Sequence, residues 1–379
     1  MTKHIQDPIH GLMSLDKRLF QLIDTPEFQR LRSIKQLGTT YQCFPSATHT
    51  RFTHSIGTCY LTGQIYDNYR SFDPDYDIDP LVVQSAGLLH DIGHGPFSHV
   101  FEKEVVPTLL GDNSWNHEEQ GLRMIDHLID KNYIDLFDSS EIAQIKGLIT
   151  GQMPSELSVL NGLVANHQYG IDADRLDYLK RDCYSVGISC GFYPQMLMTY
   201  TRPFAGRPHF HVKKKNELYQ FFHTRYTLYK QIYNHHISKA IEYMIADALI
   251  AANPIIGLKQ MVEDPELYIN LNDSILDLIK TNPHPELNQS RQILRRIDQR
   301  KFYKCVDSFD HYPSEKDLEN FDKPIIQHLK IDYGTGDQNP MTLIPFYNDA
   351  GETFQLGPSE CGMLMPQQFE EEEYRIFIR

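Results

Sequence analysis

Residues 90–99 read HDIGHGPFSH, a stretch that holds three histidines and an aspartate, with two glycines and a proline between them. His90 and Asp91 are neighbours about 100° apart on a helix, so one cation could lie between their side chains. His94 follows His90 by one helical turn, and His99 lies beyond a Gly-Pro pair at which the chain must turn. Two interpretations are open: half of a metal and acid–base site, or a histidine-rich helix end packed into the core.

A metal held by His90 and Asp91 needs ligands from elsewhere in the chain. Two segments offer them: RFTHSIG (51–57), which contains His54, and GIDADRLDY (170–178), which contains aspartates. Arg51 precedes His54 by one helical turn, so a guanidinium and an imidazole share one face. The arrangement suits a metal ligand beside an anion-binding arginine, or equally an exposed arginine beside a structural histidine.

Two further segments carry polar residues at a spacing of four. These stripes are Asp174, Tyr178 and Asp182, and Arg225, Tyr229 and Tyr233. A helix face that packs into a core is apolar, so polar stripes indicate either a pocket or a solvated face. Arginine at the head of the second stripe favours an anionic, aromatic ligand, although tyrosines at this spacing also serve packing.

The bulk composition is that of an ordinary globular protein. The 379 residues are 41% hydrophobic and 23% charged, and the net charge of −14 argues against generic binding to nucleic acid or anionic membranes. The six cysteines include no CxxC pair, which predicts reduced thiols and a cytoplasmic location, or a nuclear one in a eukaryote. No apolar run is long enough for a secretory signal or a membrane span. Eighteen histidines are a high count and indicate chemistry.

Most of the chain has the pattern of helices. Thr25 and Pro26 form a typical helix start, and Gly187 a typical helix end. Helices are predicted over residues 25–38, 51–70, 81–93, 117–131, 171–186 and 217–252. Strands are predicted over residues 301–306, 325–333 and 341–347. We therefore expect a mainly α body followed by a small α+β lobe, with the boundary between about 255 and 310.

Together these segments resemble the HD-domain phosphohydrolases, and most closely the SAM- and HD-domain deoxynucleoside triphosphate triphosphohydrolases of animal cells and their bacterial relatives. The matching segments are collinear over nearly the whole chain. They are DPIHG (7–11), IDTPEFQRLRSIKQLG (23–38), HTRFTHSIG (49–57), AGLLHDIGHGPFSHVFE (86–102), NHEEQG (116–121), GIDADRLDYLKRDC (170–183), FHTRYTLYKQIYNH (222–235) and IDYGTGDQNP (331–340). The resemblance implies an HD catalytic core over residues 1–300 and a C-terminal α+β lobe over residues 301–379. Because DPIHG begins at residue 7, no SAM domain is expected.

The resemblance also implies roles for individual residues. The metal ligands would be His54, His90, Asp91 and Asp174, a donor set that suits Fe, Mn, Zn or Mg. The catalytic group would be His94, His99, His117 and Glu102, with His99 as general acid to the leaving 5′-oxygen and Glu102 orienting it. The triphosphate and sugar would contact Arg51, Arg225, Tyr178 and Tyr229. The deoxyribose would be recognised by Gln36 and Asp182 at its 3′-hydroxyl, and by Leu37 and Tyr233 at its 2′ position.

The implied reaction is hydrolysis of a dNTP to deoxynucleoside and inorganic triphosphate, the nucleotide carrying Mg. Relatives bind a guanine nucleotide between subunits, so a GTP or dGTP effector and a homodimer or homotetramer are expected. Positions that match the guanine effector site are Lys3, Asp24, Gln29 and Arg32. Positions that match a second effector site are Arg202, Lys213, Arg300 and Lys304.

The chain departs from the animal enzymes at several of these positions. Tyr229 stands in place of a histidine, Glu102 in place of an aspartate, and His236 and Gln338 in place of effector-binding lysines. The metal and sugar sets are complete, but the second effector site loses cationic donors, so weak regulation or constitutive activity is expected. Alternatives are an HD phosphohydrolase for another nucleotide, or a single-stranded nucleic-acid-binding protein with a vestigial site. The basic run RQILRRIDQRKFYK (291–304) would serve the latter.

Overall fold

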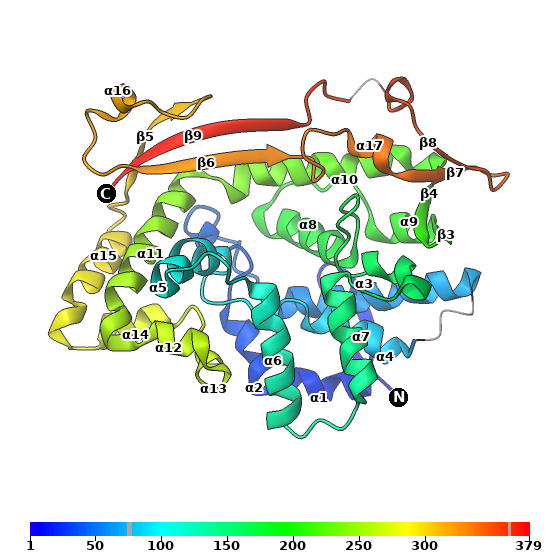
Figure 1. The fold of residues 1–379 in the computed structure, drawn as a ribbon, viewed down its shortest axis with the longest axis horizontal. Coiled ribbons are helices and arrows are strands. Elements are labelled where there is room, and N and C mark those ends of the chain that lie inside the picture. The colour runs from blue at the N-terminus through cyan, green and yellow to red at the C-terminus, as the bar shows by residue number, and fades with distance from the viewer. Residues whose placement is uncertain (74–77, 363–364) are drawn as a thin grey trace.

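A buried helix, α3 (Arg51–Phe72), organises the helical body. The computed structural model describes residues 1–73, 78–362 and 365–379, and in it α3 packs against α4 (Pro80–Leu89) and α8 (Ala173–Val186). Most residues of α3 are buried because neighbouring helices cover it, as expected for the central helix of a body. These three helices place the residues of the HD stretch and of the 170–183 segment beside one another (Figure 1).

The other helices surround this centre, and many begin with a proline or end at a left-handed glycine. Proline occupies the first turn of α2, α5, α9, α13 and α17, where its missing N–H costs nothing. Their bounds are α1 (Phe20–Ile23), α2 (Pro26–Gln29), α5 (Val106–Leu110), α6 (His117–Lys131), α7 (Ser139–Thr150), α9 (Pro194–Thr199), α10 (Lys215–Leu228), α11 (His236–Ile256), α12 (Leu258–Glu263), α13 (Pro265–Tyr268), α14 (Ile275–Thr281), α15 (Asn288–Asp298), α16 (Glu315–Leu318) and α17 (Pro340–Leu343).

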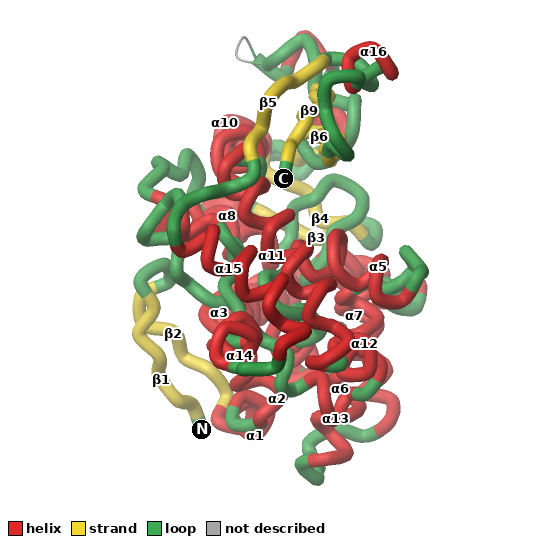
Figure 2. The backbone as a smooth tube through the Cα atoms, turned by 90° about the vertical axis from the view of Figure 1, so that its left-hand side faces the viewer, coloured by secondary structure: helices red, strands yellow, loops and turns green. Residues whose placement is uncertain are grey.

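Three small sheets complete the fold. An N-terminal hairpin pairs β1 (Thr2–Asp7) with β2 (Gly11–Asp16) and lies at one side of the helices (Figure 2). A second sheet has the order β5 (Lys304–Phe309), β9 (Glu370–Ile378), β6 (Ile325–Asp332), all antiparallel, and lies above α10 and α11 (Figure 1). The third has the order β3 (Thr201–Phe204), β4 (Arg207–His211), β7 (Pro345–Tyr347), β8 (Thr353–Gln355), with β4 and β7 parallel. The chain is mainly α with a small α+β C-terminal region, as predicted.

The C-terminal strands include one that pairs with a strand of the preceding part of the chain. Strand β7 pairs with β4, so residues after 340 complete a sheet that begins near residue 201. The pairing does not locate a boundary, and the division at residues 300 and 301 remains a prediction. Within the described part of the chain, no helix has the length and apolar character needed to cross a membrane.

Two predicted helices are wrong in extent. The helix predicted over 25–38 ends as a 3-10 turn at Ser33, because Ile34 is extended and the Lys35 N–H donates to Asp273 instead of continuing the helix. The helix predicted over 217–252 is interrupted between α10 and α11 by a π-helical turn (Tyr229–Tyr233). At that break Asn234 donates its side-chain amide to the Tyr229 carbonyl, and Arg375 of β9 bonds the Asn234 carbonyl.

A third helix, predicted over 81–93, ends earlier than predicted, and the residues after its end form the HD stretch. Helix α4 ends at Leu89, and the carbonyl groups of the following turn are bound by side chains from other elements. Arg30, which is buried, donates to the carbonyls of Ile92 and His94 at 2.6 and 2.8 Å, and the Tyr268 hydroxyl donates to that of Gly93 at 2.7 Å. The HD stretch is therefore a loop with a fixed shape.

Candidate active site

The loop of residues 90–99 directs its histidines in two directions. Phe97 and Ser98 both have a φ of 57°, the left-handed region that non-glycine residues seldom adopt. The Phe97 N–H donates to Asp273 at 2.7 Å, which holds this conformation. The predicted turn at Gly95-Pro96 is present, and beyond it the chain brings His99 back beside His94, with ring centroids 5.2 Å apart. The loop thus supplies one cluster with His90 and Asp91 and a second cluster with His94 and His99.

The first cluster joins helices α3 and α8 to the loop. The Nε2 atoms of His54 and His90 lie 3.2 Å apart, and Oδ1 of Asp174 lies 3.0 Å from the former and 3.5 Å from the latter. Burial disfavours the charged form of His54, but hydrogen bonds to Asp174 and Asp177 raise its pKa to about 10. A strong preference for positive charge at this point is what a cation site between buried carboxylates requires.

The donor chemistry of this cluster fits a divalent metal. His90 directs Nδ1 to the Gly87 carbonyl at 2.9 Å, which can only accept, so the proton is on Nδ1 and the lone pair on Nε2. His54 directs Nδ1 to Asp177 at 2.8 Å. Ring nitrogens fixed in this way by outer partners are typical of metal-bound histidines. Two imidazoles and one carboxylate converge, and the described residues therefore contain a group that could hold an ion.

Asp91 lies at the edge of this cluster and is shared. Its carboxylate oxygens are 3.5 Å from Nε2 of both His54 and His90, and Oδ1 is 3.4 Å from Nε2 of His94. Arg51 donates to its Oδ2 at 2.5 Å. Although burial opposes ionisation, the charge of Arg51 holds the pKa of Asp91 well below its usual range. Asp91 is thus available as a carboxylate ligand, and Arg51 is buried against it instead of projecting into solvent.

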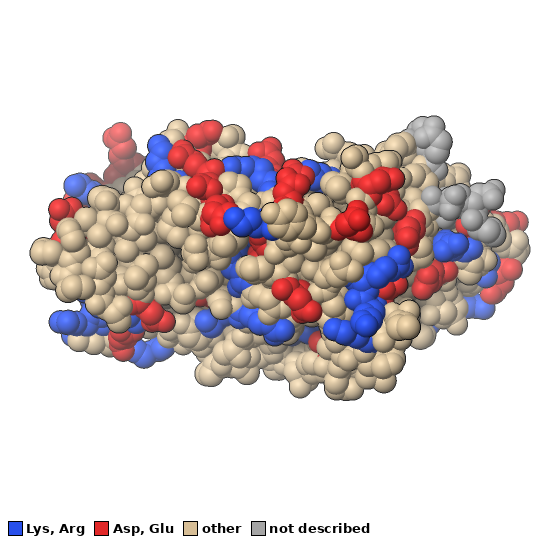
Figure 3. Space-filling model, turned by 90° about the horizontal axis from the view of Figure 1, so that it is seen from below, with Lys and Arg blue, Asp and Glu red and all other residues tan. Residues whose placement is uncertain are grey.

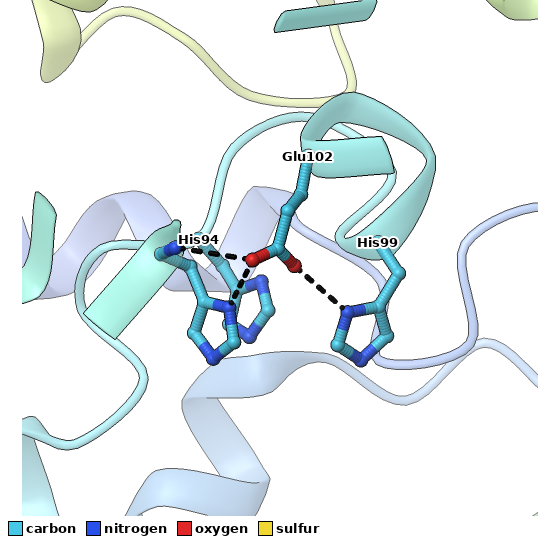
Figure 4. A group of neighbouring side chains, drawn as sticks. His94, His99 and Glu102 are labelled. Carbon is cyan, nitrogen blue, oxygen red and sulfur yellow. Dashed lines mark hydrogen bonds and ion pairs between the residues drawn. The ribbon is translucent and has the colours of Figure 1, made fainter. Parts of the chain in front are cut away.

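The second cluster consists of His94, His99, Glu102 and His117, and Figure 4 shows how Glu102 lies between His94 and His99. Glu102 comes from the π-helical turn Phe101–Val105 that follows the loop. Its Oε2 is 3.1 Å from Nδ1 of His99, and its Oε1 is 3.0 Å from Nδ1 of His117. Burial raises the pKa of Glu102, but the bonds from His117 and His99 outweigh it and lower that pKa below its usual range. One ionised carboxylate therefore orients two histidines.

The predicted sugar-reading residues Asp182, Tyr233 and Gln36 are connected through His49. Asp182 accepts from the Tyr233 hydroxyl at 2.5 Å, and its other oxygen is 2.7 Å from Nε2 of His49. Gln36 is held near His49, because its backbone N–H donates to the His49 carbonyl. The buried side-chain Oε1 of Gln36 has no hydrogen-bond partner among the described residues. Leu37 is partly buried against the core. A buried acceptor such as Oε1 of Gln36 is expected to bond a ligand or a water molecule.

Arg225 contacts two of the other residues predicted to bind the triphosphate, Tyr178 and Tyr229. It donates to the hydroxyls of Tyr178 and Tyr229 at 3.3 and 3.4 Å, and its guanidinium carbon lies 4.4 Å above the Tyr229 ring. Tyr178 connects this group to the metal cluster, with its ring centroid 6.3 Å from that of His54. Gly334 approaches so closely that a Cβ there would be 3.1 Å from Nε of Arg225. The C-terminal loop of residues 331–340 thus closes over this arginine.

The predicted guanine-effector residues lie around the N-terminal hairpin. Lys3 and Asp24 line the same surface cleft of about 660 Å³, and Lys3 lies over the Phe20 ring at 3.9 Å. Gln29 and Arg32 form a separate pair, with Nε of Arg32 donating to Oε1 of Gln29 at 2.7 Å.

The second effector set is divided between two ends of the molecule. Arg202 and Lys213 lie near β4 and β7, whereas Arg300 and Lys304 lie at the junction of α15 and β5 (Figure 1). Lys213 is bonded to Asp349 at 2.8 Å, and Arg300 to the Gln42 carbonyl at 3.2 Å. A single chain therefore does not assemble these four residues into one site.

Sequence reasoning missed the residues that support the metal cluster. Asp177 accepts from both nitrogens of the Arg181 fork at 2.9 Å and lies 2.6 Å from Nε2 of His10, in addition to its bond with His54. Asp7, from the same DPIHG segment as His10, bonds Arg181 at 2.9 Å. The spacing of three residues between Asp174 and Asp177 was a usable signal, since it places both on one face of α8. His49, Arg30 and Asp273 carried no comparable local signal.

Comparisons with known proteins agree with this geometry. A sequence model described as the HD domain matches residues 51–182, the span that contains both clusters. A deoxynucleoside triphosphate triphosphohydrolase SAMHD1 homolog of Dictyostelium discoideum is 39% identical over 100% of this chain and 77% of its own length. The SAMHD1 enzymes of Danio rerio and Homo sapiens are 34% and 31% identical over 100% of this chain and 71% and 70% of their own lengths. The chain is an HD-domain phosphohydrolase and belongs to the SAMHD1-related family of deoxynucleoside triphosphate triphosphohydrolases.

Proposed function

We propose that this enzyme hydrolyses a dNTP to deoxynucleoside and inorganic triphosphate at the two histidine clusters of the loop of residues 90–99. The observation that carries the proposal is the adjacency of three groups: the His54–His90–Asp174 cluster, the general acid–base cluster around Glu102, and the Asp182–Tyr233 pair. The ring centroid of Tyr178 lies 6.3 Å from that of His54, and its hydroxyl accepts from Arg225. Arg225 also donates to Tyr229, whose ring centroid lies 5.0 Å from that of Tyr233, so these contacts connect the first group to the third.

His54, His90, Asp91 and Asp174 would hold the divalent ion, which could be Fe, Mn, Zn or Mg. When bound, such an ion supplies positive charge to a phosphate oxygen and favours deprotonation of an attacking water. Arg225 would neutralise further charge on the triphosphate, which arrives with Mg. Arg51, already bonded to Asp91, would hold that carboxylate in place and add positive potential beside the phosphate.

His99 is assigned the protonation of the leaving group; partial burial lowers the pKa of its free ring to about 4, so its charged form would depend on the negative charge of the bound triphosphate. Nδ1 of His99 is held by Glu102, and 59% of the His99 side chain is exposed, so Nε2 can reach a bound substrate. In the reaction a water oxygen forms a bond to the α-phosphorus and its proton passes to solvent, the bond from phosphorus to the 5′-oxygen breaks, and that oxygen takes a proton from His99. His94 and His117, whose rings stack 3.8 Å apart, would contact the phosphoryl oxygens.

Asp182 and Gln36 would bond the 3′-hydroxyl of the sugar. Tyr233 and Leu37 would leave no space for a 2′-hydroxyl, so that ribonucleotides are excluded by contact. Tyr229, stacked under Arg225, would keep the guanidinium directed to the phosphates. We place the enzyme in the cytoplasm, or in the nucleus of a eukaryote.

Regulation by GTP or dGTP would use the cleft lined by Lys3 and Asp24, with Gln29 and Arg32 nearby. A second effector site that combines Arg202 and Lys213 with Arg300 and Lys304 would need more than one copy of the chain, so a homodimer or homotetramer is proposed with it. Nucleic-acid binding is not favoured, because acidic and basic side chains are interspersed on the face shown in Figure 3 and the net charge is −14.

The test is product analysis with each dNTP and rNTP, in the presence of Mg²⁺, Mn²⁺ or Fe²⁺ and with or without GTP. Deoxynucleoside and triphosphate are expected from dNTPs, rNTPs should be turned over at least about tenfold more slowly, and His90→Ala and Asp174→Ala should abolish turnover while the protein stays folded. His311→Ala, which removes a surface histidine paired with Asp310, is the matched control and should retain activity. Hydrolysis of only a monophosphate or cyclic nucleotide would overturn the proposal.

A further inference from the structure

The cluster of His94, His99, Glu102 and His117 has the composition of a metal site in its own right. Each residue offers a ring nitrogen or a carboxylate oxygen, and the four donor atoms all lie within 4.8 Å of one another. Oε1 of Glu102 lies 3.0 Å from Nδ1 of His117, and its other oxygen, Oε2, lies 3.1 Å from Nδ1 of His99. Donors around a tetrahedral zinc at about 2.0–2.1 Å lie roughly 3.3 Å apart, so little movement would be needed.

A buried, unpartnered nitrogen provides a second and independent observation. The His94 side chain is almost completely buried, at 1% exposure, and its Nδ1 has no hydrogen-bond partner among the described residues. Its Nε2 is turned to Asp91, 3.4 Å away, which leaves Nδ1 for the other side. In Figure 4 the His94 side chain lies beside the carboxylate of Glu102, on the side opposite His99. A buried polar atom without a partner is expected to have a ligand or a water molecule.

The donors select the class of ion. Three imidazoles and one carboxylate suit zinc and similar d-block ions, whereas magnesium and calcium prefer oxygen donors. Glu102 is the residue that closes the set, because its side chain is long enough for one oxygen to reach His99 and the other His117. We propose that this quartet is a second cation site, for Zn²⁺ or a similar ion, distinct from the His54–His90–Asp174 cluster.

Occupation of this site has a consequence that rests on the proposed function. An imidazole nitrogen bound to an ion carries no proton, and an ion held by Glu102 would draw the His99 ring away from the leaving group. The ion would also cover the surface of His94 and His117 that contacts the phosphoryl oxygens. Zn²⁺ in excess of the first site is therefore an inhibitor of hydrolysis, and chelation relieves the inhibition.

Binding can be tested without reference to turnover, by titration of the metal-free protein with Co²⁺ and Zn²⁺, read by the visible absorption of four-coordinate Co²⁺ and by metal content after gel filtration. Wild type should bind two equivalents. The double variant His90→Ala/Asp174→Ala should retain one, and His99→Ala, at an exposed position that should not disturb folding, should also retain one. Glu102→Gln in the double-variant background should weaken the remaining binding by on the order of 100-fold or more. His311→Ala, the matched control, should bind two.

A single equivalent in wild type, or two equivalents in His99→Ala, would overturn the second site. The outcomes for this site and for the proposed function are separable. Two equivalents in a protein that releases no deoxynucleoside from any dNTP would support the site and refute the function. Turnover of dNTPs by a wild-type protein that binds only one equivalent of metal ion would support the function and refute the second site. Inhibition of wild type by Zn²⁺ with the same concentration dependence as filling of the second equivalent supports the proposal, and its absence at full occupancy overturns the inhibitory role.

Discussion

Replacement of Arg30 by methionine should both destabilise the protein and disorganise the catalytic loop. Arg30 is buried and donates to the carbonyls of Ile92, His94 and Leu271 at 2.6, 2.8 and 2.7 Å. Its guanidinium also lies 4.8 Å from the centroid of the Tyr268 ring. Burial lowers the pKa of Arg30, which indicates that the buried charge is itself costly. Two of the three acceptors belong to the stretch of residues 90–99.

The magnitude follows from these contacts. A hydrogen bond from a charged donor contributes about 1.5–3 kcal/mol, so loss of three bonds removes roughly 4–9 kcal/mol. Release of a buried charge returns several kcal/mol, and methionine refills most of the volume. The free energy of unfolding should fall by about 2–4 kcal/mol, a large part of the roughly 5–15 kcal/mol typical of a domain. Three buried carbonyls are left without donors, and those of Ile92 and His94 would turn toward other partners.

The assay is urea-induced unfolding of the metal-free protein, together with hydrolysis measured well below the transition. Arg123→Met is the matched control, because Arg123 also donates to a backbone carbonyl, that of Glu263 at 2.6 Å, but is exposed. The control should change the free energy of unfolding by less than about 1 kcal/mol and leave hydrolysis unchanged. In folded Arg30→Met, hydrolysis should fall at least about tenfold, since loop placement within 1 Å is required. Equal unfolding midpoints for Arg30→Met and wild type would refute the reasoning.

Four further outcomes are expected. Asp177→Asn should lower the metal affinity of the first cluster about 10–100-fold, because that carboxylate fixes the ligand histidine of α3; metal content after dialysis measures it. Gly93→Ala would place a Cβ 2.1 Å from a backbone oxygen of α6 and should cost more than about 2 kcal/mol of stability, whereas Gly111→Ala, with nothing within 4 Å, should cost about 1 kcal/mol, both read by urea unfolding. Tyr233→Phe, which removes a bond to Asp182, should reduce the preference for dNTPs over rNTPs about tenfold in kcat/KM. Chelation should abolish hydrolysis and lower Tm, with recovery on addition of Mn²⁺.

Each of these has a contrary result. Metal content of Asp177→Asn equal to that of wild type would remove the supporting role of that residue. Equal stability of the two glycine variants would show that the close approach of the loop to α6 is not tight. Unchanged discrimination by Tyr233→Phe would separate that hydroxyl from sugar recognition, and activity that survives exhaustive chelation would contradict a metal requirement.

The elements that local signals determine are those that the sequence predicted well. Helix α8 ends at Gly187, whose φ of 76° is favourable for glycine, and α6 begins after Asn116, whose side chain accepts from the Glu119 N–H. The errors lie where a distant partner intervenes. Asp273 takes the Lys35 N–H and ends the first helix, and Arg375 takes the Asn234 carbonyl where the long helix breaks. Pairing of β4 with β7 across more than 130 residues had no local signal either.

In the candidate site, too, features with a local signal were predicted and features set by distant residues were not. The histidines and aspartates of the two clusters stand in short polar motifs, so their types and spacing were visible in the sequence. Their grouping in space, with His54 and His90 3.2 Å apart, agrees with what the resemblance implied. Residues that act through them, such as Asp177, His10 and Arg30, are ordinary charged positions until the fold brings them within bonding distance. Sequence could therefore predict the donors, but not the contacts that fix the donors in place.

Hydrolysis of a dNTP in ¹⁸O-labelled water tests the central claim most directly, because the label records which phosphorus atom is attacked and which bond breaks. The released triphosphate should carry one ¹⁸O and the deoxynucleoside none, and His90→Ala should form no labelled product. Label in a deoxynucleoside monophosphate or in pyrophosphate would contradict attack at the α-phosphorus with departure of the nucleoside.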